Sequence, residues 1–122
     1  MRMSTNSKLM TALSGVVNNV YPLAKPTTED PSEYIVFNPE ADYLDYGDDI
    51  DQSEDRSWQV HWFKRGIANS VSVRRQIRDA LRAAGFVLMP NTYEAYENDT
   101  GVTTKTPTGW THLVITCRIE ED

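Results

Sequence analysis

A run of acidic side chains stands out among the residues that could carry chemistry. Residues 40–55 hold eight of the chain's eighteen acidic residues and contain no Lys or Arg. Carboxylates at this density could bind a divalent cation, supply a carboxylate pair for acid–base catalysis, or form a charged connector between structured elements. The spacing of these residues decides which class of protein the segment indicates.

The spacing does not fit an EF-hand calcium loop. Such a loop needs oxygen ligands at positions 1, 3 and 5, Gly at position 6 and a bidentate Glu at position 12. A loop that begins at Asp49 has Glu54 at position 6 and Val60 at position 12. A loop that begins at Asp45 has Gly47 at position 3. Neither register works, and a divalent-metal-binding module or small enzyme using segment 40–55 is kept as the alternative hypothesis.

Acid–base catalysis by this segment is disfavoured for a different reason. A catalytic carboxylate pair needs two groups in contrasting environments, one of them desolvated. Eight like charges repel one another and resist packing, so the segment supplies no such contrast. We therefore expect residues 40–55 to form a solvated, mobile connector between two strands.

Two histidines and one cysteine are the other candidates for chemistry. His61 and His112 both fall in expected strands and could approach each other across a sheet, although a packed or surface histidine is the simpler interpretation. Cys117 alternates with apolar residues, which predicts a core position rather than a nucleophile. No Cys/His cluster has metal-ligand spacing, and no glycine-rich loop could cradle a phosphate. The sequence thus predicts no catalytic, cofactor-binding or metal-binding residue.

Hydrophobic periodicity predicts the elements that must position these residues. Apolar residues at helical spacing predict a helix over residues 4–20, capped by Ser4 or Thr5 and ended before Pro22. A second helix is expected within residues 66–85, with Gly85 as its natural stop. Period-two patterns predict strands over residues 34–38, 56–64 and 109–122. A further strand is expected to begin at residue 86, to be interrupted at Pro90 and to resume near residues 93–96.

This order of elements predicts the fold class. The elements follow one another as helix, strand, strand, helix, strand, strand. The simplest architecture with this order is an α+β fold, with two helices packed on one face of a mainly antiparallel four-stranded sheet. The acidic segment then becomes a long inter-strand loop. At 122 residues, the chain is expected to form a single domain spanning residues 1–122.

The second expected helix carries arginines on one side, next to its apolar stripe. They are either the solvated side of an amphipathic helix or the complement of an acidic surface on a neighbouring subunit. Separate acidic and basic surfaces on one chain suit a head-to-tail contact, and repeated contacts of this kind close into a ring. The residues of this expected assembly interface are Asp45, Asp48, Asp49, Asp51, Glu54, Asp55, Arg74, Arg75, Arg78 and Arg82.

The overall charge narrows the expected partners. Outside residues 40–55, ten acidic residues stand against twelve Lys and Arg, so the formal charge of −6 is a local feature. A nucleic acid partner would need a basic face, so we expect no nucleic-acid specificity. The apolar runs are too short for a signal sequence or a membrane span. A soluble protein of a reducing cytoplasm is the expectation.

Several motifs in order resemble a known protein family. They are "VYP" after the first helix, "YIVF", the acidic lead-in to "WQVHWFKRG", "LRAAGF" and "YEAYENDTG". This order is similar to the tail completion, tail terminator or head–tail joining proteins of long-tailed bacteriophages, and it covers nearly the whole chain. The chain departs from the family pattern at residues 102–104, where an aromatic residue or His often follows the Thr-Gly pair.

The resemblance implies a structural role in the virion. Family members cap the tail tube at full length and offer a surface for joining the head, working as rings that are commonly hexamers. The implied partners are further copies of the chain, the tail tube protein and the head connector or head completion protein. The implied location is the head-proximal end of the tail, with assembly in the cytoplasm of the host bacterium. The implied action makes and breaks no bond, so neither an enzyme nor a cofactor is expected.

Overall fold

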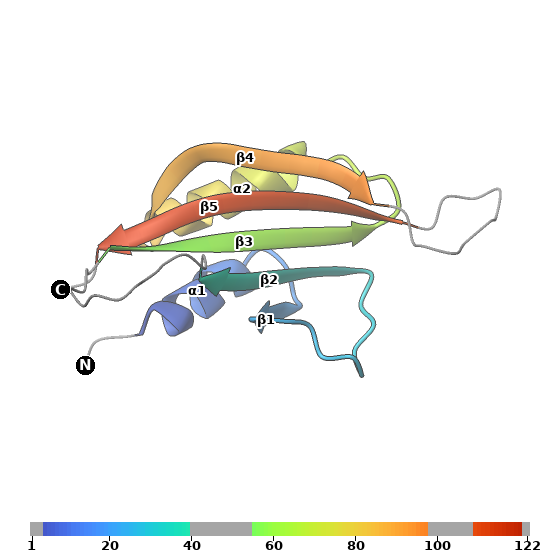
Figure 1. Cartoon of the computed structure of the whole chain (residues 1–122), viewed down its shortest axis with the longest axis horizontal. Helices are drawn as coiled ribbons and strands as arrows, with labels where there is room; N and C mark the ends of the chain where they lie inside the picture. The colour runs from blue at the N-terminus through green and yellow to red at the C-terminus, as the bar shows by residue number, and fades with distance from the viewer. Residues whose placement is uncertain (1–3, 40–54, 98–108, 121–122) are drawn as a thin grey trace, which may run out of the picture.

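The computed structural model describes residues 4–39, 55–97 and 109–120 of the chain. These residues form an α+β fold with two helices and one sheet (Figure 1). In chain order the elements are α1 (Thr5–Ser14), β1 (Val20–Pro22), β2 (Glu33–Pro39), β3 (Asp55–Arg65), α2 (Val71–Ala83), β4 (Val87–Glu97) and β5 (Trp110–Glu120).

The sheet contains five strands in the described part of the chain, in the order β1-β2-β3-β5-β4. The three pairs from β2 to β4 are antiparallel, whereas β1 pairs with β2 in parallel, Val20 opposite Ile35. The expectation of four strands was therefore wrong by one strand. The extra strand, β1, comprises residues that the periodicity assigned to the end of the first helix and to its stop at Pro22.

Helix α1 begins where the sequence predicts and ends earlier. The Ser4 side chain accepts a hydrogen bond from the Ser7 backbone N–H at 3.1 Å, which caps the helix as expected. The helix stops at Ser14 because Gly15 is a poor helix former, and the β-branched and Asn residues at positions 16–19 extend the unfavourable stretch. The chain is therefore already extended at Val20, which pairs with β2.

Helix α2 ends at the predicted glycine. Gly85 has a φ of 96°, in the left-handed region that favours glycine. The Gly85 N–H donates to the Arg82 carbonyl at 3.0 Å, and the Phe86 N–H donates to the Leu81 carbonyl at 2.9 Å. These two bonds form a Schellman motif, and Phe86 is buried alongside Leu81 in the same core. The motif turns the chain from α2 directly into β4.

Strand β4 is continuous across Pro90 rather than interrupted there. It pairs only with β5 in the sheet order, and the register shifts between Leu88 and Thr92. Proline cannot donate a ladder hydrogen bond, so an edge strand at an irregularity is the position in a sheet that tolerates it. The shift decides which β5 residue lies opposite each β4 residue from Thr92 onward.

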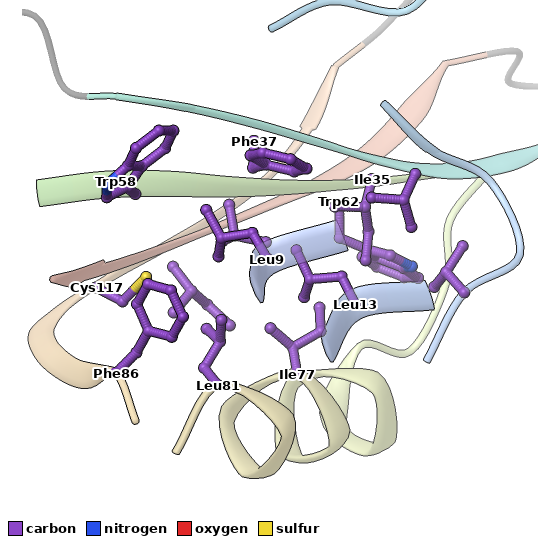
Figure 2. Packing of buried hydrophobic residues seen from close by; sticks show 14 of the residues in the cluster. Leu9, Leu13, Ile35, Phe37, Trp58, Trp62, Ile77, Leu81, Phe86 and Cys117 are labelled. Atoms are coloured by element: carbon purple, nitrogen blue, oxygen red, sulfur yellow. The ribbon is translucent and has the colours of Figure 1, made fainter. Parts of the chain in front are cut away.

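One face of the sheet and both helices enclose the core. Alternate residues of the central strands point to the helices: Trp58, Val60 and Trp62 from β3, and Leu113, Ile115 and Cys117 from β5 are all buried. Figure 2 shows side chains of α1 and α2 meeting beneath the sheet, Leu9 and Leu13 from the first helix and Ile77 and Leu81 from the second. Both helices therefore cover the same face of the sheet.

We expect Leu81→Ala to lower the free energy of unfolding by about 2–5 kcal/mol. Leu81 is 0% exposed, so its truncation removes buried methyl groups and leaves a cavity between α2 and the sheet. Denaturant unfolding followed by circular dichroism measures the change. The matched control is Val71→Ala in the same helix, where the side chain is 56% exposed and the cost should stay within about 0.5 kcal/mol. Equal losses for the two variants would contradict this core.

Candidate functional site

The arginines of α2 lie along one side of the helix, and we call Arg74, Arg75, Arg78 and Arg82 the arginine stripe. Their spacing places them next to the buried stripe that contains Ile77 and Leu81. They line two surface depressions. The first is formed with residues 85–90, at the start of β4, and the second lies along the helix from Val71 to Arg82. The arginine stripe therefore borders the β4 edge of the sheet.

Two members of the arginine stripe have acidic partners. Arg74 donates to the Glu94 carboxylate of β4 at 2.8 Å, and that same oxygen accepts from the Ser70 hydroxyl at 2.7 Å. Arg82 lies 3.7 Å from Asp79 in an exposed pair of the same helix, which contributes little stability. Among the described residues, no acidic partner is seen for Arg75 or Arg78. These two arginines are the members best placed to meet another molecule.

The acidic half of the expected interface lies mostly outside the described residues. This holds for Asp45, Asp48, Asp49, Asp51 and Glu54. The remaining member, Asp55, begins β3 and is paired there with Glu120 of β5. Residues 40–54 follow β2 and precede β3 in the sequence, so the expected inter-strand loop also lies outside the described residues.

The sheet face opposite the helices carries a second group of functional side chains, and we call it the open face. In the view of Figure 1 this face is toward the reader, with both helices on the far side of the sheet. Cross-strand partners put Tyr34 beside Phe63, Phe63 beside His112 and Tyr93 beside Val114. No helix of the described chain covers these residues, and most of them are half-buried by one another.

Aromatic rings run across the open face as a continuous row. The Tyr34 and Phe63 rings stack with centroids 4.8 Å apart, and Phe63 stacks on His112 at 4.2 Å. Trp110 meets Tyr34 edge to face at 5.5 Å, and the Arg65 guanidinium lies 4.2 Å from the centre of the Trp110 ring. These contacts hold large apolar rings in place at the surface, which is the composition found at the centres of protein interfaces.

A hydrogen-bonded array lies within this row. His61 Nδ1 and His112 Nε2 are 2.9 Å apart. The other nitrogens of the two rings are also engaged, since His112 Nδ1 lies 2.8 Å from Glu97 Oε2 and His61 Nε2 lies 3.2 Å from Gln59 Oε1. The two histidines thus do approach across the sheet, one of the possibilities raised by the sequence. Glu97 was missed, because its position depends on the register of β4 beyond the irregularity at Leu88–Thr92.

The surroundings of His61 act on its pKa. Burial lowers the pKa of His61, and the neighbouring His112 lowers it further, while Glu97 opposes both. His61 therefore resists taking a positive charge of its own. No group of three or more His, Cys, Asp or Glu side chains suited to hold a metal ion occurs among the described residues.

Cys117 is fully buried on the helix side of β5, as the alternation predicts. Burial raises the pKa of its thiol to about 12, so the reactive thiolate is scarce near neutral pH. The residue belongs to the core and has no role at either surface.

We expect Cys117 in the folded protein to resist thiol reagents at pH 8 and to react at once in denaturant. The raised pKa keeps the thiol protonated, and its reaction rate should rise about tenfold with each pH unit below 12 as long as the fold persists. Absorbance of the released chromophore follows the reaction. A variant with Cys117→Ala and Ser72→Cys gives the rate of an exposed cysteine. Fast native labelling at pH 8 would contradict the buried position.

Comparison with known proteins yields no match to a protein-family model and no significant match to a curated protein. Neither described helix has the length and apolar character needed to cross a membrane. The case for a function therefore depends on the motifs of the sequence and on the two surfaces described above.

Proposed function

We propose that this chain is a structural virion assembly protein of a long-tailed phage or prophage. It caps the tail tube and forms the surface to which the head is joined. The ordered motifs, from "VYP" to "YEAYENDTG", support this proposal because they resemble those of tail completion and tail terminator proteins. Its action is stoichiometric, since binding to the tube end stops further addition of tube protein.

The observation that carries the proposal is the separation of opposite charge on one chain. Arg75 and Arg78 lie on α2 without acidic partners among the described residues, next to the β4 edge of the sheet. Segment 40–55, with its eight acidic residues, lies in the sequence between β2 and β3, two strands that β5 separates from β4 in the strand order. A basic surface and an acidic segment on different parts of a chain favour a head-to-tail contact between copies.

A contact of this kind can build a closed assembly. A heterologous contact uses two different surfaces of each subunit, and a suitable rotation between subunits closes it into a ring. We propose a homo-oligomeric ring, as a hexamer, with the tail tube protein on one side and the head connector or head completion protein on the other. The open face adds large aromatic side chains, which contribute apolar contact area that charge pairs alone do not supply.

We expect Arg75→Glu and Arg78→Glu, singly and together, to impair tail capping while the monomer stays folded. Reversal of these charges turns attraction to an acidic neighbour into repulsion. Neither change removes an ion pair within the described chain, whereas reversal of Arg74 would place a carboxylate beside Glu94. Electron microscopy of purified protein mixed with tail tubes measures the fraction of capped tube ends, and circular dichroism checks the fold.

Lys8→Glu on α1 is the matched control, because it makes the same charge change on the other helix. It should leave capping close to that of the unaltered protein. Normal capping by the folded Arg75→Glu, Arg78→Glu double variant would contradict the arginine stripe as an interface. Absence of capping by the unaltered protein would contradict the proposed function itself.

Calorimetric titration with Ca²⁺, Mg²⁺ and Mn²⁺ distinguishes the structural role of segment 40–55 from metal binding. The structural role predicts no binding tighter than about 10 μM, the weak end of the range for calcium sensors. Tighter binding that is abolished by Asp48→Asn, Asp49→Asn and Asp51→Asn together would favour a metal-binding module instead.

A further inference from the structure

The hydrogen bonds at the two ends of the histidine array determine where its protons lie. The Glu97 carboxylate can only accept, so His112 Nδ1 carries a proton and donates it at 2.8 Å. In the amide orientation of this structure the Gln59 Oε1 atom faces His61 Nε2 at 3.2 Å, and with that orientation His61 Nε2 carries a proton and donates it. Each outer nitrogen is therefore a donor.

The two inner nitrogens then need one more proton. If both rings were neutral, His61 Nδ1 and His112 Nε2 would each present a lone pair, and the lone pairs would face each other across 2.9 Å. The ring centroids are 5.1 Å apart and the planes differ by 29°, so the rings meet edge to edge with these nitrogens between them. Two acceptors at this separation repel, whereas one proton between them makes a hydrogen bond of ordinary length.

We propose that His61 and His112 hold one shared proton. His112 is then an imidazolium that donates to Glu97 on one side and to His61 on the other. In this state every polar atom of the array has a partner of the opposite kind. The pair functions as a one-proton switch on the open face of the sheet.

The charged and titratable groups around the pair favour one proton and oppose two. Glu97 of β4 lies in direct contact with His112 and stabilises a single positive charge. Tyr93 of β4 meets His112 edge to face. Burial raises the pKa of Tyr34 of β2, Arg65 of β3 lowers it, and Glu97 raises it. The Lys25 ammonium lies 5.8 Å from the centre of the Tyr34 ring. A second proton would have to enter His61, which burial and the charge on His112 both oppose.

Loss of the shared proton reverses the donor and acceptor roles of the two His61 nitrogens. Once the proton leaves His112 Nε2 for solvent, two lone pairs face each other. That repulsion is relieved when His61 exchanges its Nε2 proton for one on Nδ1 and donates to His112. Gln59 must then turn its amide so that its N–H₂ group donates to His61 Nε2. The open face thus changes its charge by one unit and turns one amide, which makes any contact formed there depend on pH. This inference does not rest on the proposed virion role.

Nitrogen-15 NMR of the histidine side chains between about pH 5 and 8 tests the switch directly. In the protonated state we expect protons on both nitrogens of His112, a proton on Nε2 of His61, and a scalar coupling across the His112–His61 hydrogen bond. Raising the pH should remove one proton from the pair and move the His61 proton to Nδ1. The second proton should enter only at distinctly lower pH.

Two outcomes would overturn the proposal. One is a His61 ring that keeps its proton on Nδ1 throughout this range beside a His112 whose Nε2 is never protonated. The other is two rings that titrate independently to full imidazolium without coupling between them. The unaltered protein suffices for both readouts, so no variant needs to fold for the test to decide.

Glu97→Gln provides a second measurement. Removal of the carboxylate that faces His112 should move the first titration step of the pair to lower pH. Asp79→Asn removes the same charge from exposed α2 and should leave that step unchanged. An equal effect of the two variants, or no effect of Glu97→Gln, would count against the array as described.

Discussion

The pairing of β3 with β5 is the constraint on which the rest of the structure depends. These two strands occupy the centre of the described sheet and match along eleven positions, from Asp55–Glu120 to Arg65–Trp110. Their side chains alternate between the two faces, so a slip of one residue would exchange the core residues with those of the open face. Burial of Trp58 and Trp62 in the core makes such a slip costly, and it thereby sets the open face as well.

Both exposed surfaces follow from this core. Because Val60 and Trp62 point to the helices, His61 and Phe63 must point away from them. Because Ile77 and Leu81 anchor α2 beneath the sheet (Figure 2), the arginine stripe lies beside that anchor, and its members Arg78 and Arg82 line a depression with the start of β4. Neither surface contributes much to the core. Their charges and rings are therefore available for recognition at little cost to folding.

The two surfaces differ in their electrostatic character. The arginine stripe carries permanent charge, which two of its members share with acidic neighbours in the same chain. The histidine array carries a charge that depends on one proton, and it lies among aromatic rings with the Glu97 carboxylate as its charged neighbour. An assembly that used both would combine a steady attraction, weakened by salt, with a contact that responds to pH. The two surfaces can therefore be separated experimentally.

Local patterns in the sequence determined much of the fold and little of its chemistry. Period-two alternation in the third and fifth strands, the arginine spacing of α2 and the glycine stop at Gly85 are properties of neighbouring residues, and all three are present in the structure. Strand β1, by contrast, forms because Val20 pairs with Ile35. The histidine array forms because the register of β4 shifts before Glu97. Both depend on partners distant in the chain. Only the tertiary structure decides them, because hydrogen bonds and ring contacts across a sheet depend on which strands become neighbours and in what register.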